Sequence, residues 1–246
     1  MISVCLACFN GQKYIKNQIE SILSQLQKDD EIIVSDGGST DDTIKIISEI
    51  KDKRIKLVKL DSINDREPNE PVFRIMNRIS KNFESALKHA KGEFIFLADQ
   101  DDIWLPDKIK RMLPYFEHYC CIVHDCYVTD SNLKVLSDTF FNYIKPNTSF
   151  LGTLYRSSFM GCCMAFKKDV LELSLPFPAY PIEHDTWIGI NALSFGKVLC
   201  LNDSLIFYRR HTDNVSSCAE GSKNSIYIKL KRRMFILRAI ISRLFL

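Results

Sequence analysis

Short apolar runs alternate with amphipathic helical patterns through the first hundred residues, and this alternation is the feature that most narrows the folds open to the chain. Runs with the character of buried strands lie at 2–7, 31–35, 55–60 and 94–98. Helical spacing of apolar residues fills the gaps between them, at 14–26, 44–50 and 83–90. Strands that alternate with helices of this length form a mostly parallel central sheet flanked by helices, so the predicted fold class is α/β.

The second half of the chain has a looser pattern. Strands are predicted at 120–128, 161–166 and 205–209, and a helix at 186–195. A polar stretch at 61–70 is predicted to be a loop, and Lys91-Gly92 is predicted to close the preceding helix as a C-cap. No repeat and no Pro-, Gly- or Ser-rich linker is visible, so no domain boundary is expected.

The composition is that of an ordinary folded protein. Lys and Arg number 33 against 30 Asp and Glu, a net charge of +3 that does not indicate a nucleic-acid partner. No apolar run reaches the roughly 18 residues that suggest a membrane span, and the first residues lack the basic start of a signal peptide. The nine cysteines are therefore expected to be reduced, as in a cytoplasmic protein, and the Cys5–Cys8 pair inside a strand is not expected to bind metal.

Three carboxylates follow the predicted strand at 94–98 within four residues: Asp99, Asp101 and Asp102. Ligands of open α/β sheets bind outside the carboxyl ends of the strands. Carboxylates this close raise each other's pKa unless a cation compensates, and oxygen ligands so arranged suit Mg²⁺ or Mn²⁺. Capping of the next helix explains one aspartate but not three, so a metal site is favoured.

Asn10 and Asp36 follow the first and second predicted strands. An acid at such a strand end can accept hydrogen bonds from a nucleotide. Ser39 and Asp42 also fit a capping box for the next helix, with two glycines before them allowing a tight turn. The two interpretations stay open at this point. Neither GxGxxG nor GxxxxGK[ST] occurs, which disfavours a Rossmann cofactor site and a P-loop.

Three motifs, in this order, resemble glycosyltransferase family 2, whose members have the GT-A fold. They are Val4 to Gly11 (VCLACFNG), Ile33 to Thr43 (IVSDGGSTDDT) and Phe96 to Trp104 (FLADQDDIW), with Asn82 to Leu87 (NFESAL) before the third. Each motif alone is weak, but three in register are specific. The resemblance to the family is close over residues 1–115 and looser from there to about residue 215. The third motif is similar to those of bacterial rhamnosyltransferase-like enzymes and other O-antigen or capsule polysaccharide transferases.

The resemblance implies a role for each polar strand end of the first half. Asp36 would contact the nucleotide base of a sugar donor, with Asn10 lining the same pocket, and Asp99 would approach the ribose or the sugar. Asp101 would bind the metal, Mn²⁺ or Mg²⁺, as an acid of the DxD motif. Many family members carry two consecutive acids where this sequence has Asp36-Gly37. The resemblance therefore does not decide which nucleotide base the site prefers.

The resemblance also assigns residues of the second half. Asp185 would be the general base that removes the proton of the acceptor hydroxyl, although its position also fits an N-cap of the helix at 186–195. His184, Trp187 and Gly161 would line the acceptor site. For Gly161 a β-bulge is the alternative.

A basic segment, Arg209, Arg210 and His211, resembles the carboxyl-terminal motif of these enzymes. The two arginines would neutralise the departing diphosphate, with a solvated strand end as the alternative. His211 would add a metal ligand.

The function implied is inverting transfer of a hexosyl or deoxyhexosyl residue, such as rhamnosyl, glucosyl or galactosyl. The donor would be a UDP- or dTDP-sugar and the acceptor a glycan, for example one linked to undecaprenyl diphosphate. The GT-A domain would span 1–215, with a nucleotide-sugar-binding half at 1–115 and an acceptor half at 116–215. A nucleotide-sugar-binding domain without catalysis and a metal-dependent phosphatase are the alternatives.

Residues 222–246 are predicted to form a basic, amphipathic helix. The last 21 residues carry six Lys or Arg and no acid, so residues 1–225 have 27 basic against 30 acidic groups. Such a helix suits the anionic surface of the inner membrane on its cytoplasmic face, where the enzyme would be peripheral. A helix that packs on the domain with solvated Lys and Arg is the alternative.

Overall fold

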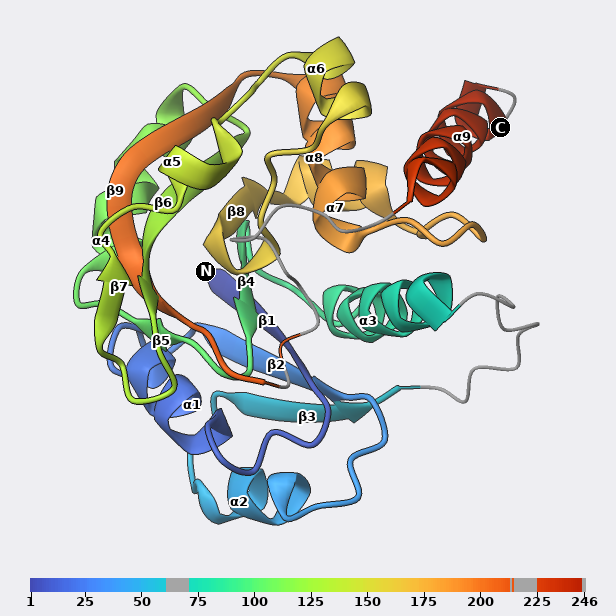
Figure 1. Cartoon of the computed structure of the whole chain (residues 1–246). Helices are drawn as coiled ribbons and strands as arrows, with labels where there is room; N and C mark the ends of the chain where they lie inside the picture. The colour runs from blue at the N-terminus through green and yellow to red at the C-terminus, as the bar shows by residue number, and fades with distance from the viewer. Residues whose placement is uncertain (61–70, 213, 215–224, 245–246) are drawn as a thin grey trace.

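A computed structural model describes residues 1–60, 71–212, 214 and 225–244 of the chain (Figure 1). The loop predicted at 61–70 lies outside these residues. A single nine-stranded sheet has the order β3-β2-β1-β4-β8-β6-β9-β5, with β7 paired to β6. Helices cover it, so the α/β class is confirmed.

The first half of the chain builds a parallel sheet around its first strand. β1 (Ile2–Cys8) pairs in parallel with β2 (Glu31–Asp36) on one side and with β4 (Phe94–Asp99) on the other, and β3 (Ile55–Lys59) extends β2. Because the register aligns Cys8 with Asp36 and Ala7 with Asp99, the polar residues that follow these strands meet at one edge. The apolar strand runs predicted from sequence are all buried strands here, except β3, which is half-buried at the sheet edge.

Three helices connect these strands and cover both faces of the sheet. α1 (Ile15–Leu23) and α2 (Thr43–Glu49) lie on one side, and α3 (Pro71–Leu87) lies on the other (Figure 1). α1 buries Ile15, Ile19 and Ile22, which recur at helical spacing and therefore share one face.

The second half completes the sheet in mixed orientation. Its strands are β5 (Ile103–Trp104), β6 (Cys121–Thr129), β7 (Val135–Ser137), β8 (Met164–Lys167) and β9 (Val198–Arg209). β8 runs antiparallel between β4 and β6, while β6 and β9 are parallel. Four of the eight strand pairs are thus parallel, so the predicted mostly parallel character holds for the first half alone.

The helical segments of this half lie between those strands. They are α4 (Lys108–Met112), η1 (Leu113–Glu117), α5 (Phe141–Ile144), α6 (Phe150–Tyr155), η2 (Gly161–Cys163), α7 (Lys168–Ser174) and α8 (His184–Phe195). One hydrophobic core unites both halves, because its buried residues run from Ile2 to Tyr208 and include both sides of β4.

Two local predictions are wrong. α3 ends at Leu87, so Lys91-Gly92 does not cap it; Gly92 instead donates its N–H to Ser3 Oγ at 2.7 Å. A Cβ on Gly92 would lie 2.5 Å from the Ser3 nitrogen, so close backbone approach explains this glycine. The strand predicted at 161–166 begins only at Met164, because Gly161–Cys163 forms a 3₁₀ turn.

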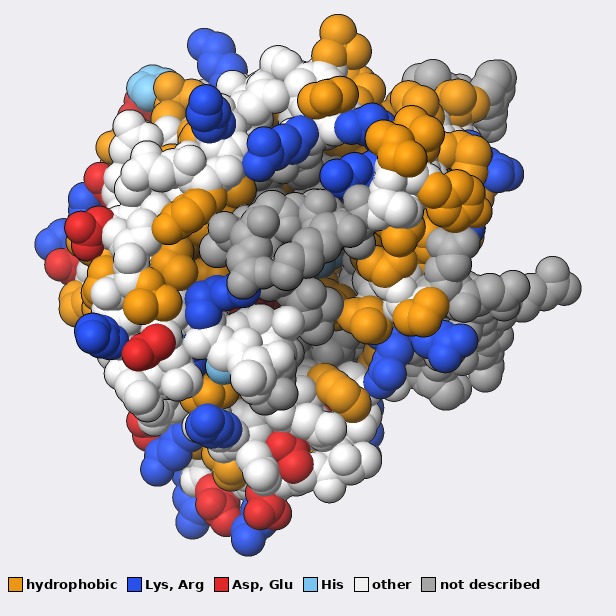
Figure 2. All heavy atoms as spheres, viewed as in Figure 1, with side chains coloured by type: hydrophobic (Ala, Val, Ile, Leu, Met, Phe, Trp, Pro, Cys, Tyr) orange, Lys and Arg blue, Asp and Glu red, His pale blue; other side chains and the backbone are white. Residues whose placement is uncertain are grey.

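The predicted carboxyl-terminal helix is present as α9 (Ile226–Leu244). It buries Ile236 and Ala239 in a second apolar cluster with Ile182, Trp187 and Ile190. In the space-filling view, hydrophobic side chains gather over this helix (Figure 2). No helix in the described part of the chain is both long and apolar enough to cross a bilayer.

Candidate active site

The ends of β1 and β2 are joined by side-chain hydrogen bonds. Asn10, at φ 49°, accepts the Thr40 N–H through Oδ1 at 2.8 Å and donates its own N–H to Ser39 Oγ at 2.9 Å. Asp36 is 6% exposed and accepts from Gly38 N at 3.1 Å and from Ser39 Oγ at 2.5 Å. The structure therefore places Asn10 and Asp36 side by side, with the carboxylate closing the turn that follows β2.

The capping box predicted within this turn is wrong. α2 begins at Thr43, and Asp42, at the N-cap position, makes no side-chain cap hydrogen bond. Ser39 Oγ donates to Asp36 rather than accepting from the helix. Instead, Asp41 accepts the Thr43 N–H at 3.0 Å, a local side-chain-to-backbone hydrogen bond at the start of α2.

Asn82 on α3 contacts the same edge of the sheet, at the end of β1. Its Nδ2 donates to the Cys8 carbonyl oxygen at 2.9 Å, and its Oδ1 is buried without a hydrogen-bond partner in the structure. A buried, unpaired acceptor is costly, so such an atom at the strand ends is a candidate for a ligand contact. The sequence motif at Asn82 to Leu87 pointed to this segment, but not to this side chain.

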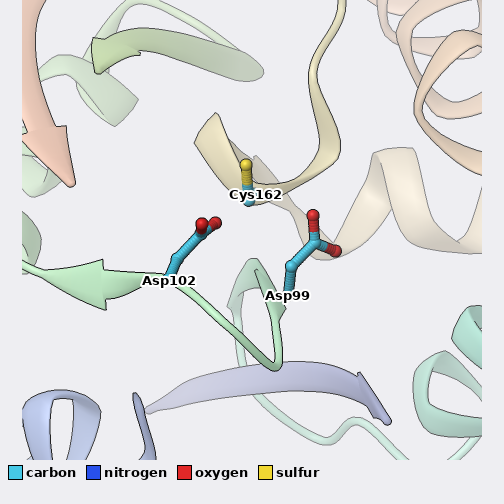
Figure 3. Close-up of side chains that lie close together, drawn as sticks. All are labelled: Asp99, Asp102 and Cys162. Carbon is cyan, nitrogen blue, oxygen red and sulfur yellow. The ribbon is translucent and has the colours of Figure 1, made fainter. Parts of the chain in front are cut away.

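The three carboxylates after β4 point in different directions. Asp99 and Asp102 face Cys162 on η2 (Figure 3). One carboxylate oxygen of Asp99, one of Asp102 and the Cys162 sulfur all lie within 4.8 Å of one another. Burial, followed by the charges of Asp101 and Asp185, raises the pKa of Asp99 to about 7. Asp101 turns away from this group and reaches His211.

Asp102 is a structural residue rather than an exposed ligand. It is fully buried, and its Oδ1 accepts the backbone N–H of Arg209 at 3.1 Å. Burial raises its pKa well above the ordinary value, and the Cys162 thiol donates to it. The fully buried Lys108 lies beneath, with Nζ 3.1 Å from the Cys162 carbonyl oxygen and 3.9 Å from the centre of the Trp104 ring.

The predicted metal ligands Asp101 and His211 lie together. His211 Nε2 is 2.8 Å from Asp101 Oδ2, and Asn214 Nδ2 donates to the same oxygen at 3.3 Å. The His211 ring also lies 5.0 Å from the ring of Tyr14 on the segment before α1. The segment that follows β9 is thereby fixed over the residues from Asp99 to Asp102, here called the acidic loop. Sequence analysis missed Asn214 and Tyr14, although Asn214 is three residues after His211.

The predicted diphosphate contact of Arg209 disagrees with its surroundings. Arg209 is 4% exposed; its Nε donates to the Asp101 carbonyl oxygen at 2.7 Å, and its Nη1 donates to the Ser131 carbonyl oxygen at 2.7 Å. The guanidinium lies 4.5 Å from the centre of the Tyr14 ring. Arg209 therefore holds the acidic loop in place. Arg210 is only partly buried, and its backbone N–H donates to Thr129 at 2.8 Å.

Asp185 lies in the first turn of α8, next to the acidic loop. Glu183 occupies the N-cap position, so the N-cap alternative for Asp185 is wrong. Burial raises its pKa to about 6, against hydrogen bonds from the backbone of Thr186 and Gly161 that lower it. The charge of Asp185 also raises the pKa of Asp99, because the two carboxylates lie in each other's field. A half-buried carboxyl with a pKa near 6 is suited to accept a proton.

All three predicted acceptor-lining residues are withdrawn from the surface. His184 is 8% exposed and stacks on Phe83 with a 3.9 Å separation of ring centres, and burial lowers its pKa to about 3. Trp187 is 1% exposed, and its Nε1 donates to the Ser174 carbonyl oxygen at 2.9 Å. His184 is therefore not placed to line an acceptor, whereas Trp187 forms part of the wall of a small pocket with Ser80 and Phe177.

Gly161 is also buried, and its role is to make room. A Cβ there would lie 2.5 Å from His184 Nε2. Its backbone hydrogen bond to Asp185 fixes the start of η2 against the start of α8. The bulge alternative is wrong as well, because Gly161 begins a 3₁₀ turn.

The donor set at the β4 and β9 ends fits a divalent cation. Asp99 and Asp101 are partly buried carboxylates whose mutual repulsion raises the pKa of Asp99, and a cation relieves such repulsion. Carboxylate oxygen with imidazole nitrogen suits Mn²⁺. Cys162 fits less well, because a hydrogen bond with Cys163, followed by burial and neighbouring charges, keeps the pKa of its thiol well above the ordinary value.

A parallel half-sheet with polar residues at its carboxyl edge, together with an acidic loop and the half-buried Asp185 near that loop, is the arrangement expected of the GT-A class. The family model for glycosyl transferase family 2 matches residues 3–174. The chain therefore belongs to glycosyltransferase family 2.

Three curated relatives each cover most of the chain. A protein of Escherichia coli named UDP-Glc:alpha-D-GlcNAc-diphosphoundecaprenol beta-1,3-glucosyltransferase WfaP is 28% identical over 225 residues, 88% of this chain and 80% of its own length. The dTDP-rhamnosyl transferase RfbG of Shigella flexneri is 26% identical over 238 residues, covering 90% and 70%. A Nostoc glycosyltransferase is 25% identical, and this chain spans 66% of it.

Solved structures share the fold. Residues 1–349 of S. aureus TarS in complex with UDP-GlcNAc superpose with a TM-score of 0.67 and 19% identity, covering 97% of this chain and 67% of that one. Glucosyl-3-phosphoglycerate synthase from Mycobacterium tuberculosis, with Mn²⁺, UDP and phosphoglyceric acid, gives a TM-score of 0.56 and 19% identity, covering 99% and 78%. These likenesses confirm the GT-A fold.

Proposed function

We propose that this chain is an inverting, metal-dependent glycosyltransferase that moves a hexosyl or deoxyhexosyl residue from a UDP- or dTDP-sugar to a glycan acceptor. The observation that carries the proposal is the approach of the half-buried Asp185 to the acidic loop, within the electrostatic reach of Asp99. Donor chemistry of this kind is supported by relatives named for UDP-Glc and dTDP-rhamnose and by a structural neighbour that holds UDP-GlcNAc.

Donor binding falls to the carboxyl ends of the parallel strands. Asp36 and Asn10 would contact the nucleotide base, and Asp99 would approach the ribose or the sugar. Asp101 and His211 would hold Mn²⁺ or Mg²⁺. That cation, when bound, supplies positive charge beside the donor diphosphate. Arg210, which is partly exposed after β9, supplies a further positive charge there.

Asp185 acts as general base in the transfer. The acceptor oxygen forms a bond to the anomeric carbon while the bond from that carbon to the phosphate oxygen breaks. The acceptor hydroxyl proton passes to Asp185, and the bonding pair leaves with the nucleoside diphosphate. Attack opposite to the leaving group inverts the anomeric configuration.

The acceptor is proposed to be a growing surface polysaccharide of the O-antigen or capsule type, carried on a lipid diphosphate. The name of the E. coli relative, which contains diphosphoundecaprenol, supports a lipid-linked acceptor of this chemistry. The enzyme would work at the cytoplasmic face of the inner membrane as a peripheral protein, with α9 as the contact.

A donor panel tests the proposal. Thermal shifts with UDP, dTDP and GDP plus Mn²⁺ first select the base. The matching sugars are then incubated with a GlcNAc-diphosphate lipid and Mn²⁺, and product mass and nucleoside diphosphate release are measured. Acceptor-dependent release with a glycosyl gain in mass is expected for the wild type and is expected to vanish in Asp185→Asn. Release of inorganic phosphate, or nucleotide binding without turnover of any donor, would overturn the proposal.

A further inference from the structure

α9 has an inner face that docks firmly on the domain. Ile236 and Ala239 are buried there. Arg232 pairs with Glu183 at 3.0 Å, and Arg243 Nη1 donates to Asn191 Oδ1 at 3.2 Å. Two of the basic residues of the helix predicted to meet the membrane, Arg232 and Arg243, therefore face the protein. The question becomes what the opposite face of this helix does.

The outer face of α9 is apolar and exposed. Its side chains recur at intervals of three or four residues and so lie on one side of the helix. Their exposed fractions lie between 45% and 70% in Ile226, Tyr227, Leu230, Met234, Leu237 and Ile241. A contiguous apolar surface of this kind on a folded protein marks an interaction site.

α6 continues this surface. Leu151 and Tyr155 are four residues apart, on one face of the helix, and are 77% and 72% exposed. Arg233 joins the two helices, because its Nη2 donates to the Tyr155 carbonyl oxygen at 2.8 Å and its guanidinium lies 4.6 Å from the centre of the Tyr155 ring. Figure 1 shows α6 and α9 on the same side of the molecule.

Basic residues border the apolar face of α9 on both sides. At 100° per residue, Lys231 and Arg238 lie beyond one margin and Lys229 and Arg233 beyond the other. The helix has no acidic residue. A two-fold pairing of α9 with a second copy would bring like charges together without an acid to pair with them. The phosphates of an anionic bilayer would neutralise these same charges, and a helix with an apolar face and basic margins lies in such an interface.

We infer that the outer faces of α6 and α9 form one surface that rests in the headgroup region of an anionic bilayer. This inference rests on the membrane contact in the proposed function and deepens it. It names the lipid-facing residues of α9, adds Leu151 and Tyr155 of α6, and assigns Arg232 and Arg243 to docking of the helix on the domain.

Vesicle flotation of the full chain tests the inference. Vesicles of phosphatidylcholine, with and without phosphatidylglycerol, are compared for the wild type and for two paired variants, Leu230→Gln with Leu237→Gln and Leu151→Gln with Tyr155→Ser. Each lost apolar contact is expected to weaken partitioning into the anionic vesicles by about tenfold. Leu136→Gln is the matched control, because Leu136 is 60% exposed on β7; its partitioning is expected to stay at the wild-type value.

Melting temperatures and size-exclusion chromatography accompany the flotation, so that a folding defect is recognised. If both paired variants bind anionic vesicles as strongly as the wild type, the inference is overturned. If only the Leu151 and Tyr155 variant does so, the part assigned to α6 is overturned. Absence of vesicle binding together with a wild-type dimer that the Leu230 and Leu237 pair dissociates also overturns it, in favour of a second copy. Donor turnover without vesicles is measured separately and is expected to be unchanged in every variant, so failure of the proposed transferase activity would be seen independently.

Discussion

The carboxyl group of Asp185 has the most telling environment of any single residue in the site. Burial raises its pKa to about 6. A base must be ionised to act, so the rate of transfer at saturating donor and Mn²⁺ is expected to rise with pH through about 6 and to level off above it. Asp185→Asn is expected to lower the rate at pH 7.5 by at least about a hundredfold. A pH–rate profile from pH 5 to 8 checks both; a flat profile, or a variant with near-normal turnover, contradicts the assignment.

Ionisation of the Asp185 carboxyl is expected to increase activity but to lower the stability of the fold. An acid whose pKa is higher in the folded than in the unfolded state binds its proton more tightly when folded, so its ionised form destabilises the fold. This cost is complete above about pH 6 and is lost as the pH falls toward the unfolded pKa of about 4. Asp185→Asn is therefore expected to raise the free energy of unfolding at pH 7, by about 3 kcal/mol at most.

Urea denaturation at pH 7 and pH 4.5 measures this effect. The gain from Asp185→Asn is expected at the higher pH and should largely disappear at the lower one. Asp29→Asn, at an exposed aspartate, is the control and should change stability little at either pH. A loss of stability at pH 7 in the Asp185 variant would show that its hydrogen bonds to the backbone of Thr186 and Gly161 outweigh its burial.

Residue types and strand ends could be predicted from the sequence, but the direction of each side chain could not. Asp99 and Asp101 were singled out by their chemistry at the end of a strand and Asp185 by the family resemblance, and in the structure the charges of Asp101 and Asp185 both act on Asp99. Arg209 and Trp187 were singled out in the same way, yet each turns inward to satisfy a backbone carbonyl oxygen. The acceptors that decide this, Asp101 O and Ser174 O, are distant in sequence, so no local pattern contains them.

At the scale of elements, the end of β9 fixes the loop that follows β4. Arg209 donates to the carbonyl oxygens of Asp101 and Ser131 and packs on Tyr14. Arg209→Gln removes a buried cation and leaves these acceptors without their donors. We expect it to lower the free energy of unfolding by about 2–4 kcal/mol and to weaken Mn²⁺-dependent nucleotide binding, because Asp101 is no longer held.

Arg210→Gln is the matched control for this prediction, since Arg210 is the next residue and is more exposed. It is expected to weaken nucleotide binding with a much smaller loss of stability. Urea denaturation and titration calorimetry with UDP and Mn²⁺ measure the two quantities. Equal losses of stability in the two variants would contradict the positioning role of Arg209.

The elements themselves were predictable where the pattern is local. Buried strands and amphipathic helices of the first hundred residues follow from apolar spacing, and so does α8, which is buried nearly all round. Placement of β8 between β4 and β6 did not follow, because antiparallel insertion depends on contacts across the sheet. Gly92 was misread for the same reason: the atom that requires a glycine there belongs to Ser3.

At the scale of the whole molecule, the donor and acceptor halves share one hydrophobic core. Its buried residues come from β1, β2 and β4 in the first half and from β6, β8 and β9 in the second. A core that crosses the predicted division at 115 implies that the halves unfold together. Residues 1–115 alone would leave the free edge of β4 unpaired, so the division describes function within one folding unit.

Ligand binding at the seam between the halves should therefore stabilise the whole molecule. Mn²⁺ relieves the repulsion that raises the pKa of Asp99, and a nucleoside diphosphate brings charge that holds the cation. UDP and Mn²⁺ together, at about a hundredfold their dissociation constants, are expected to add about 3 kcal/mol and to raise the melting temperature by about 5–10 °C in one calorimetric transition. Asp101→Asn should remove most of the Mn²⁺-dependent part. A shift confined to one of two separate transitions would mean that the nucleotide site belongs to the first half alone.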